Sequence, residues 1–146
     1  MVSGVAAALR SVNTVRPEKV RALVVEDSRT IAAIVKHYLQ VEGFEVLVAS
    51  DGVVGLETAV RERPHVIVTD LNLPGMGGMD MVRALRADTR THDIAIFMLT
   101  SDGSADTERQ ARAVGADDYI LKPVEPRCLA ARVRAVMDRA ERVACE

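Results

Sequence analysis

Acidic residues follow two separate apolar runs of this 146-residue sequence. Glu26 and Asp27 come directly after one run, and Asp70 ends another. Carboxylates a few ångströms apart raise one another's pKa unless a cation holds them. Carboxylate oxygens with few other fixed protein ligands suit Mg²⁺, which keeps several of its waters. If the three residues meet, they predict a divalent metal site that keeps Asp70 ionised.

An ionised Asp70 can act as a nucleophile. Carboxylate nucleophiles accept phosphoryl groups and form aspartyl phosphates. The charge on the transferring group needs a metal and cationic or hydrogen-bonding partners rather than acid–base chemistry. Lys122 and Thr100, each at the end of a further apolar run, supply a positive charge and a hydroxyl group. Together these residues indicate phosphoryl transfer to Asp70.

Local patterns predict the elements that must position these side chains. Strands are expected at 20–25, 44–49, 65–70, 94–100 and 118–122, and helices at 29–42, 52–63, 78–87, 104–114 and 126–143. Ser28 and Asp51 are the predicted caps of the first two helices. The expected apolar faces contain Ile31, Ile34, Val35, Tyr38 and Leu39 in the first helix, Val53, Leu56 and Val60 in the second, and Met81, Val82 and Leu85 in the third.

Five strands that are each followed by a helix predict a parallel sheet covered on both faces. An eight-stranded barrel needs about 250 residues, so the expected fold is an open, doubly wound five-stranded α/β sheet, flavodoxin-like (βα)5. With the strand order 2-1-3-4-5, the first and third strands are neighbours at the switch point where ligands bind. Glu26, Asp27 and Asp70 are then expected in one crevice.

Bulk composition narrows the function classes. Hydrophobic residues make up 49% and charged residues 27%, the balance of an ordinary globular domain. A net charge of -2 and an aromatic content of 3% argue against direct nucleic-acid binding. No apolar run approaches the roughly 18 residues of a membrane span. Cys128 and Cys145 fit free thiols of a reducing compartment, so a cytoplasmic protein is expected.

The motifs resemble the receiver domain of bacterial response regulators in two-component signalling, of the chemotaxis-regulator kind, from about Val20 to Val143. The motifs that carry the resemblance are the acidic pair "ED", "VTDLNLPGMGG" around Asp70, "MLTS" and "YILKP". The resemblance implies that Asp70 is the phosphorylation site. It also implies that Thr100 contacts the phosphoryl group and that Lys122 pairs with it.

Further roles are carried over by the same resemblance. Asp27, Asp70 and the backbone carbonyl of Asn72 are expected to bind Mg²⁺ or Mn²⁺, with Glu26 acting through water. Tyr119 matches a switch aromatic residue that rotates inward when Thr100 shifts, and the Lys122–Pro123 peptide bond is expected to be cis.

Two positions depart from the common family pattern. Many members have a second aspartate where this sequence has Glu26, and a smaller residue, often Ala, where it has Ser101. The Ser101 side chain is expected to border the phosphoryl entrance and to slow access to Asp70.

The resemblance also implies partners. A sensor histidine kinase or a histidine phosphotransfer protein would donate the phosphoryl group, and a downstream protein target or an attached effector would respond. Contact with nucleic acid or membrane is not expected. A phosphorylation-dependent dimer through the 104–143 face is a possible further partner. Residues 1–19 are expected to be an N-terminal extension, 20–143 the receiver domain and 144–146 a tail, with no output domain in this chain. The alternative is a receiver fragment of a larger regulator or hybrid kinase.

Two other functions use a similar fold or similar chemistry. A hydrolase of the haloacid dehalogenase kind uses a second Asp two residues after its nucleophile, where this sequence has Asn72. A flavodoxin-like flavin carrier needs a first loop that holds a phosphate, which Glu26 and Asp27 would repel. A receiver that accepts a phosphoryl group and dephosphorylates itself, without being a turnover enzyme, is therefore favoured.

Overall fold

The structure is a computed structural model that describes residues 19–145, with side chains up to residue 138. Most of the expected N-terminal extension, 1–19, and the end of the expected tail, 144–146, lie outside the described residues. The elements in chain order are β1 (Arg21–Val25), α1 (Arg29–Val41), β2 (Glu45–Ala49), α2 (Gly52–Glu62), β3 (Val66–Asp70), α3 (Gly78–Ala87), β4 (Ala95–Thr100), α4 (Ala105–Val114), β5 (Asp118–Leu121) and α5 (Pro126–Cys145). Each strand is one residue shorter than predicted, and α5 runs two residues further.

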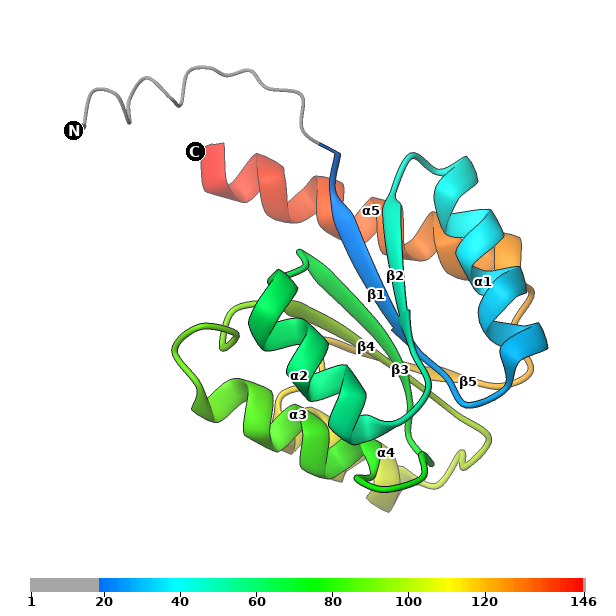
Figure 1. The fold of residues 1–146 in the computed structure, drawn as a ribbon, viewed down its shortest axis with the longest axis vertical. Helices are drawn as coiled ribbons and strands as arrows, with labels where there is room; N and C mark the ends of the chain where they lie inside the picture. The colour runs from blue at the N-terminus through cyan, green and yellow to red at the C-terminus, as the bar shows by residue number, and fades with distance from the viewer. Residues whose placement is uncertain (1–18, 146) are drawn as a thin grey trace.

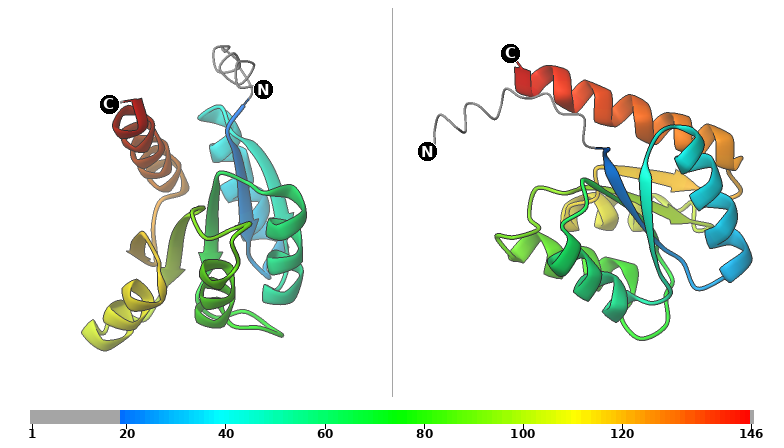
Figure 2. Two further views of the ribbon diagram at one scale, coloured as in Figure 1. Left: turned by 90° about the vertical axis from the view of Figure 1, so that its left-hand side faces the viewer. Right: turned by 45° about the horizontal axis from the view of Figure 1, so that its top comes forward.

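The five strands form one parallel sheet in the predicted order β2-β1-β3-β4-β5. Helices α1 and α5 cover one face of the sheet, and α2, α3 and α4 cover the other (Figures 1 and 2). Successive strand residues alternate between the two faces: Val24 joins the core under α1 and α5, whereas Leu23 and Val25 join the core under α2, α3 and α4. Both faces are thus buried by helices, as a parallel sheet requires.

The two predicted helix caps and several of the predicted core residues are confirmed. The Ser28 hydroxyl accepts a hydrogen bond from the Ile31 N–H (3.3 Å), and the Asp51 carboxylate accepts one from the Val54 N–H (2.8 Å). In α3, the predicted inward residues Met81, Val82 and Leu85 are fully buried.

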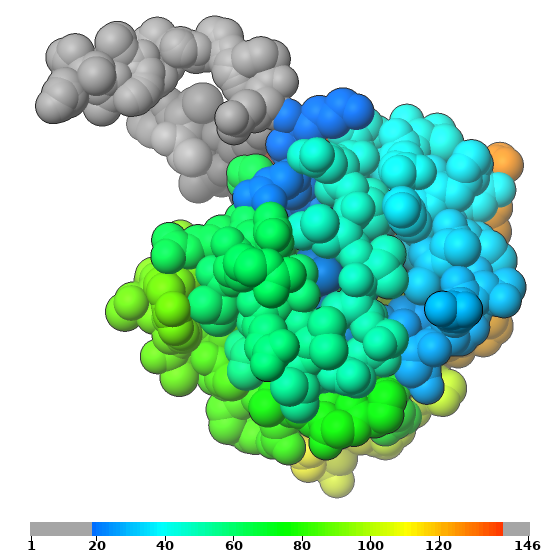
Figure 3. Space-filling view, in the orientation of Figure 1, coloured from blue at the N-terminus to red at the C-terminus, as the bar shows by residue number. Residues whose placement is uncertain are grey.

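The predicted apolar faces of α1 and α2 are wrong at three positions. Ile31, Ile34 and Val53 have exposed fractions of 44%, 41% and 44%. Helix α1 packs on the sheet through Ala32, Val35 and Leu39, so Ile31 and Ile34 lie along one side of its buried stripe. In the space-filling view α1, β2 and α2 lie next to one another on the viewed face (Figure 3).

A glycine brings the start of α3 against the end of β3. A Cβ atom at Gly78 would lie 2.4 Å from the Asp70 carbonyl oxygen, so any larger residue would push the two backbones apart. The Gly78 N–H also donates to the Leu71 carbonyl (2.8 Å). The loop that carries Asn72 is therefore tied back to the strand end that carries Asp70.

Arg86 on α3 binds the segments that directly precede β4 and β5, at the end of the sheet away from Asp70. Its guanidinium donates to the carbonyls of Gly115 (Nη2, 2.8 Å) and Ile94 (2.6 Å) and to the Asp117 carboxylate (3.0 Å). We expect Arg86→Met to lower the free energy of unfolding by about 2–4 kcal/mol, because it leaves partly buried carbonyls without donors. Urea denaturation measures this loss. The control Arg83→Met removes only an exposed ion pair and should cost below about 0.5 kcal/mol; equal losses would contradict the role of Arg86.

Candidate functional site

The carboxyl ends of β1 and β3 bring the three predicted acids together. Val25 pairs with Thr69 across the two strands, so Glu26 and Asp27 begin their loop beside Asp70. One carboxylate oxygen from each acid lies within 4.8 Å of the others. Glu26 and Asp70 are buried, with exposed fractions of 5% and 6%, whereas Asp27 is exposed. The crevice predicted from strand order therefore contains one surface acid and two buried ones.

Lys122 and Thr100 approach the acids from the neighbouring strand ends. Thr100 ends β4 and is buried, and its carbonyl accepts a hydrogen bond from the Lys122 N–H (2.7 Å). The Lys122 Nζ lies 2.6 Å from Asp70 Oδ1 and 4.0 Å from Glu26 Oε1. The Lys122–Pro123 peptide bond is cis. One ammonium group thus faces both buried carboxylates.

The buried oxygen of Asp70 has an unusual environment. The 2.6 Å contact with Lys122 has the distance of an ion pair but not the direction of a hydrogen bond. Asp70 Oδ1 is accordingly a buried side-chain oxygen without a hydrogen-bond partner among the described residues. A buried polar atom left unpaired is costly. A hard divalent cation fits this donor set, because it would be bound by clustered carboxylate oxygens that the protein itself leaves partly unsatisfied.

The charge state of Glu26 reflects the same crowding. Burial raises its pKa from 4.5 to about 7, and the neighbouring Asp70 carboxyl adds to the effect. The Ser28 N–H, which donates to Glu26 Oε2 (3.0 Å), and the Lys122 charge oppose the rise without cancelling it. Near neutral pH and without a cation, a large fraction of Glu26 is therefore protonated.

This pKa predicts a pH-dependent stability for the metal-free protein. The folded state keeps a proton on Glu26 that the unfolded chain releases near pH 4.5. The contribution of Glu26 to stability is therefore fully present at or below that pH and is lost as the pH rises to about 7, by an amount of roughly 1–3 kcal/mol. Urea denaturation in a chelator between pH 5 and 8 measures this trend. The neutral variant Glu26→Gln should flatten it, and an identical slope in both proteins would contradict the prediction.

Asn72 and Ser101 lie at the margin of the site. Asn72 is exposed in the loop that directly follows Asp70, so its backbone carbonyl comes from the same strand end as the acids. Its use as a metal ligand stays a prediction. Ser101 is exposed beside Thr100, at the rim of the hollow described below.

Tyr119 is half-buried, and its ring packs against the core under α2, α3 and α4. Its hydroxyl donates to the backbone carbonyl of Asp102 (2.5 Å), and burial followed by the Asp102 charge raises its pKa. The Asp102 N–H donates to Thr100 Oγ1 (3.0 Å). Sequence reasoning missed Asp102. The available signal was an acid in "SDGS", two residues after a strand end and two before a helix cap.

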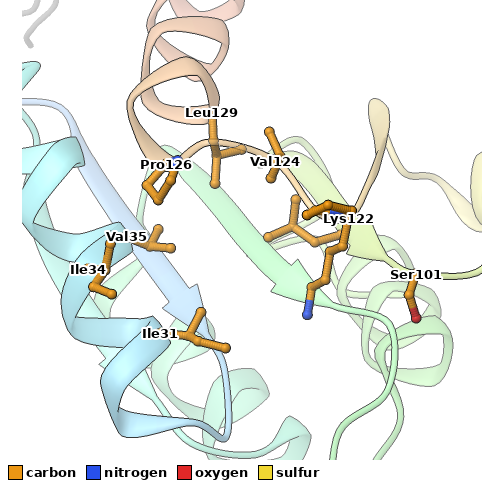
Figure 4. A pocket seen from close by; sticks show the side chains of 10 residues that line it. Ile31, Ile34, Val35, Ser101, Lys122, Val124, Pro126 and Leu129 are labelled. Atoms are coloured by element: carbon orange, nitrogen blue, oxygen red, sulfur yellow. The ribbon is translucent and has the colours of Figure 1, made fainter.

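An aliphatic hollow opens beside Lys122, with a volume of about 440 Å³. Figure 4 shows Ile31, Ile34 and Val35 of α1 facing Val124, Pro126 and Leu129 across it, with the Lys122 side chain along one side. The sequence prediction assigned Ile31 and Ile34 to the core and therefore missed this hollow. Lys122 connects the hollow to the acid cluster, because it lines the hollow and its ammonium group contacts Asp70.

None of the described helices is long and apolar enough to span a membrane.

Comparison with known proteins identifies relatives of the chain. The family model of the response regulator receiver domain matches residues 22–134. The DNA-binding response regulator MtrA of Mycobacterium tuberculosis H37Rv is 45% identical over 120 residues, 82% of this chain and 51% of MtrA. The DNA-binding dual master transcriptional regulator RpaA of Synechocystis is 38% identical over 123 residues, 84% of this chain and 51% of RpaA. The chain thus spans about half the length of these curated relatives.

A solved structure gives the same result for the fold. The chemotaxis response regulator CheY4 of Vibrio cholerae superimposes with a TM-score of 0.77 at 35% identity, over 82% of this chain and 99% of CheY4.

Proposed function

Because the chain belongs to the response regulator receiver domain family of bacterial two-component systems, we propose that it accepts a phosphoryl group on Asp70 from a phosphohistidine. The observation that carries the proposal is the Lys122 ammonium 2.6 Å from Asp70 Oδ1, in a cluster with Glu26 and Asp27. This arrangement brings a nucleophile, a cation-binding acid pair and a fixed positive charge to one strand edge.

The transfer follows from these groups. A carboxylate oxygen of Asp70 attacks phosphorus, the P–N bond to the donor histidine breaks, and the imidazole nitrogen takes up a proton. Asp27, Asp70 and the Asn72 carbonyl would hold Mg²⁺ or Mn²⁺, with Glu26 acting through water, and the cation supplies positive charge next to the carboxylates and the phosphoryl oxygens. Lys122 pairs with a phosphoryl oxygen, and the buried Thr100 hydroxyl donates to another.

The product is a phosphorylated protein rather than a released metabolite. Asn72 stands where an aspartyl-phosphate hydrolase has its acid–base carboxylate, so this chain has no group there to speed turnover. Hydrolysis of the aspartyl phosphate by water then returns the protein to its starting state. Ser101, at the entrance, slows the approach of that water and of the donor.

Phosphorylation then changes the surface of α4, β5 and α5. The phosphoryl charge draws in Thr100, and Tyr119 responds because both residues contact Asp102. A downstream protein, an attached effector or a second copy of the chain through 104–143 would read this change. The DNA-binding relatives suggest an attached effector as one such output, because the chain spans half of their length.

We assign the aliphatic hollow to the phosphodonor. A phosphohistidine can reach Asp70 only if the protein that carries it rests on the surface around Lys122. Lys122 also lines the hollow, so the hollow is continuous with that surface. Ile31 and Ile34 expose apolar area there that a helix with aliphatic side chains would cover. We propose that the occupant is a helical histidine-bearing domain of a kinase or phosphotransfer protein, and that the reaction takes place in the cytoplasm.

The proposal is tested by labelling with acetyl phosphate. In Mg²⁺ the protein should gain one hydroxylamine-sensitive phosphoryl group, and a chelator should lower the rate at least about tenfold, because carboxylates and phosphoryl oxygens then repel one another. Asp27→Ala should lose the Mg²⁺-dependent labelling and keep the fold. The control Asp106→Ala, an exposed acid on α4, should behave as wild type. Wild-type labelling at the same rate with and without Mg²⁺ would contradict the proposed metal site.

A further inference from the structure

The loop between β4 and α4 contains an acid that uses every polar group it has. Asp102 is exposed, yet its N–H donates to Thr100 Oγ1 (3.0 Å) and its carbonyl accepts from the Tyr119 hydroxyl (2.5 Å). Its Oδ1 accepts from the Ser104 N–H (2.9 Å), and its Oδ2 accepts from the Thr107 hydroxyl (2.7 Å). One residue thus joins the phosphoryl-binding threonine, the aromatic residue of β5 and the first turn of α4.

Helix α4 depends on its first turn more than its neighbour α3 does. Of its side chains only Ala111 is buried, whereas α3 buries Met81, Val82 and Leu85. A short helix gains most of its stability from tertiary packing of its apolar face, so the hydrogen bonds at the start of α4 form a large share of what fixes it. The Thr107 hydroxyl and the Ser104 N–H lower the pKa of Asp102, which keeps it ionised as an acceptor.

We propose that Asp102 is a positioning residue that connects Thr100 to α4. The inference rests on the proposed function, in which Thr100 meets the phosphoryl group. Because Thr100 Oγ1 accepts from the Asp102 N–H, the Thr100 hydroxyl proton is free to be donated to a phosphoryl oxygen while this bond is kept. A shift of Thr100 toward Asp70 therefore moves the Asp102 backbone, and the Asp102 carboxylate passes the movement to Ser104 and Thr107.

The test compares amide chemical shifts before and after Mg²⁺ and beryllofluoride are added to the full chain. Wild type, Asp102→Ala and the control Asp106→Ala should show the same saturating shifts at 70–77. Shifts at 105–114 should fall at least about threefold in Asp102→Ala. They should stay unchanged in Asp106→Ala, whose carboxylate forms an ion pair with Arg109 and no other among the described residues. If Asp102 only stabilised the fold, its replacement would not weaken the α4 shifts while leaving the beryllofluoride shifts at 70–77 unchanged.

A second variant keeps the test decisive if Asp102→Ala does not fold. Thr107→Val preserves side-chain shape and removes one donor to Asp102, so it should weaken the α4 response in the same direction and to a smaller extent. An undiminished response at 105–114 in the folded variants would overturn the role of Asp102 and leave the proposed function standing. A wild type without shifts at 70–77 would overturn the proposed function itself.

Discussion

Asp70→Asn is expected to abolish phosphorylation, with labelling by acetyl phosphate at least about 10³-fold below wild type. The reason is chemical: an amide oxygen is a far weaker nucleophile than a carboxylate, and the variant also loses one of the clustered acids that would bind the cation. Rapid-quench labelling in Mg²⁺ measures the rate. Asp51→Asn is the matched control, because Asn caps a helix as well as Asp does and Asp51 caps α2.

The same variant tests the conformational response. With Mg²⁺ and beryllofluoride, which mimics the aspartyl phosphate, amide shifts in wild type should spread from Asp70 to Thr100, Tyr119 and residues 104–115. Hydrogen bonds to a dianion contribute about 1.5–3 kcal/mol each, enough to invert a two-state ratio near 1:10. Asp70→Asn should show none of these shifts. A response in the variant equal to that of wild type would place the phosphoryl-binding site elsewhere.

Ile34→Asp is expected to separate the two kinds of phosphodonor. Transfer from a histidine kinase that phosphorylates the wild type should fall at least about 30-fold, because a buried aliphatic contact at the centre of an interface contributes about 2 kcal/mol or more and a charge there costs desolvation as well. Labelling by acetyl phosphate should stay within about twofold of wild type, since Ile34 lines the hollow and makes no contact in the acid cluster.

The control for this prediction lies on the same helix. Val41 is 67% exposed at the last residue of α1 and does not line the hollow, so Val41→Asp adds the same charge to α1 outside the proposed interface. It should leave both kinds of transfer unchanged. Equal losses in the two variants would indicate a general effect of charge on α1 and would remove the hollow as the docking surface. A loss of acetyl phosphate labelling in Ile34→Asp would mean that the substitution disturbs the acid cluster itself.

The sequence by itself determined the strand ends and therefore which residues meet. Alternating strand and helix patterns are local, and a parallel sheet sends the ends of all strands to one edge. With the strand order 2-1-3-4-5, which the structure has, these local patterns are sufficient to predict that Glu26, Asp70 and Lys122 lie at the same edge. Their contact distances and the burial of two of the acids are consistent with that topology.

Only the tertiary structure decided what covers each side chain. Helical spacing indicates that Ile31 and Ile34 share a face, but whether a neighbouring element covers that face depends on where α5 begins in space, and here it leaves a hollow. The raised pKa of Glu26 and the four hydrogen bonds of Asp102 likewise arise from contacts between segments far apart in the sequence or from loop conformation. Periodicity reports the direction of a side chain along its own element, whereas burial, charge state and coupling are properties of the assembled fold.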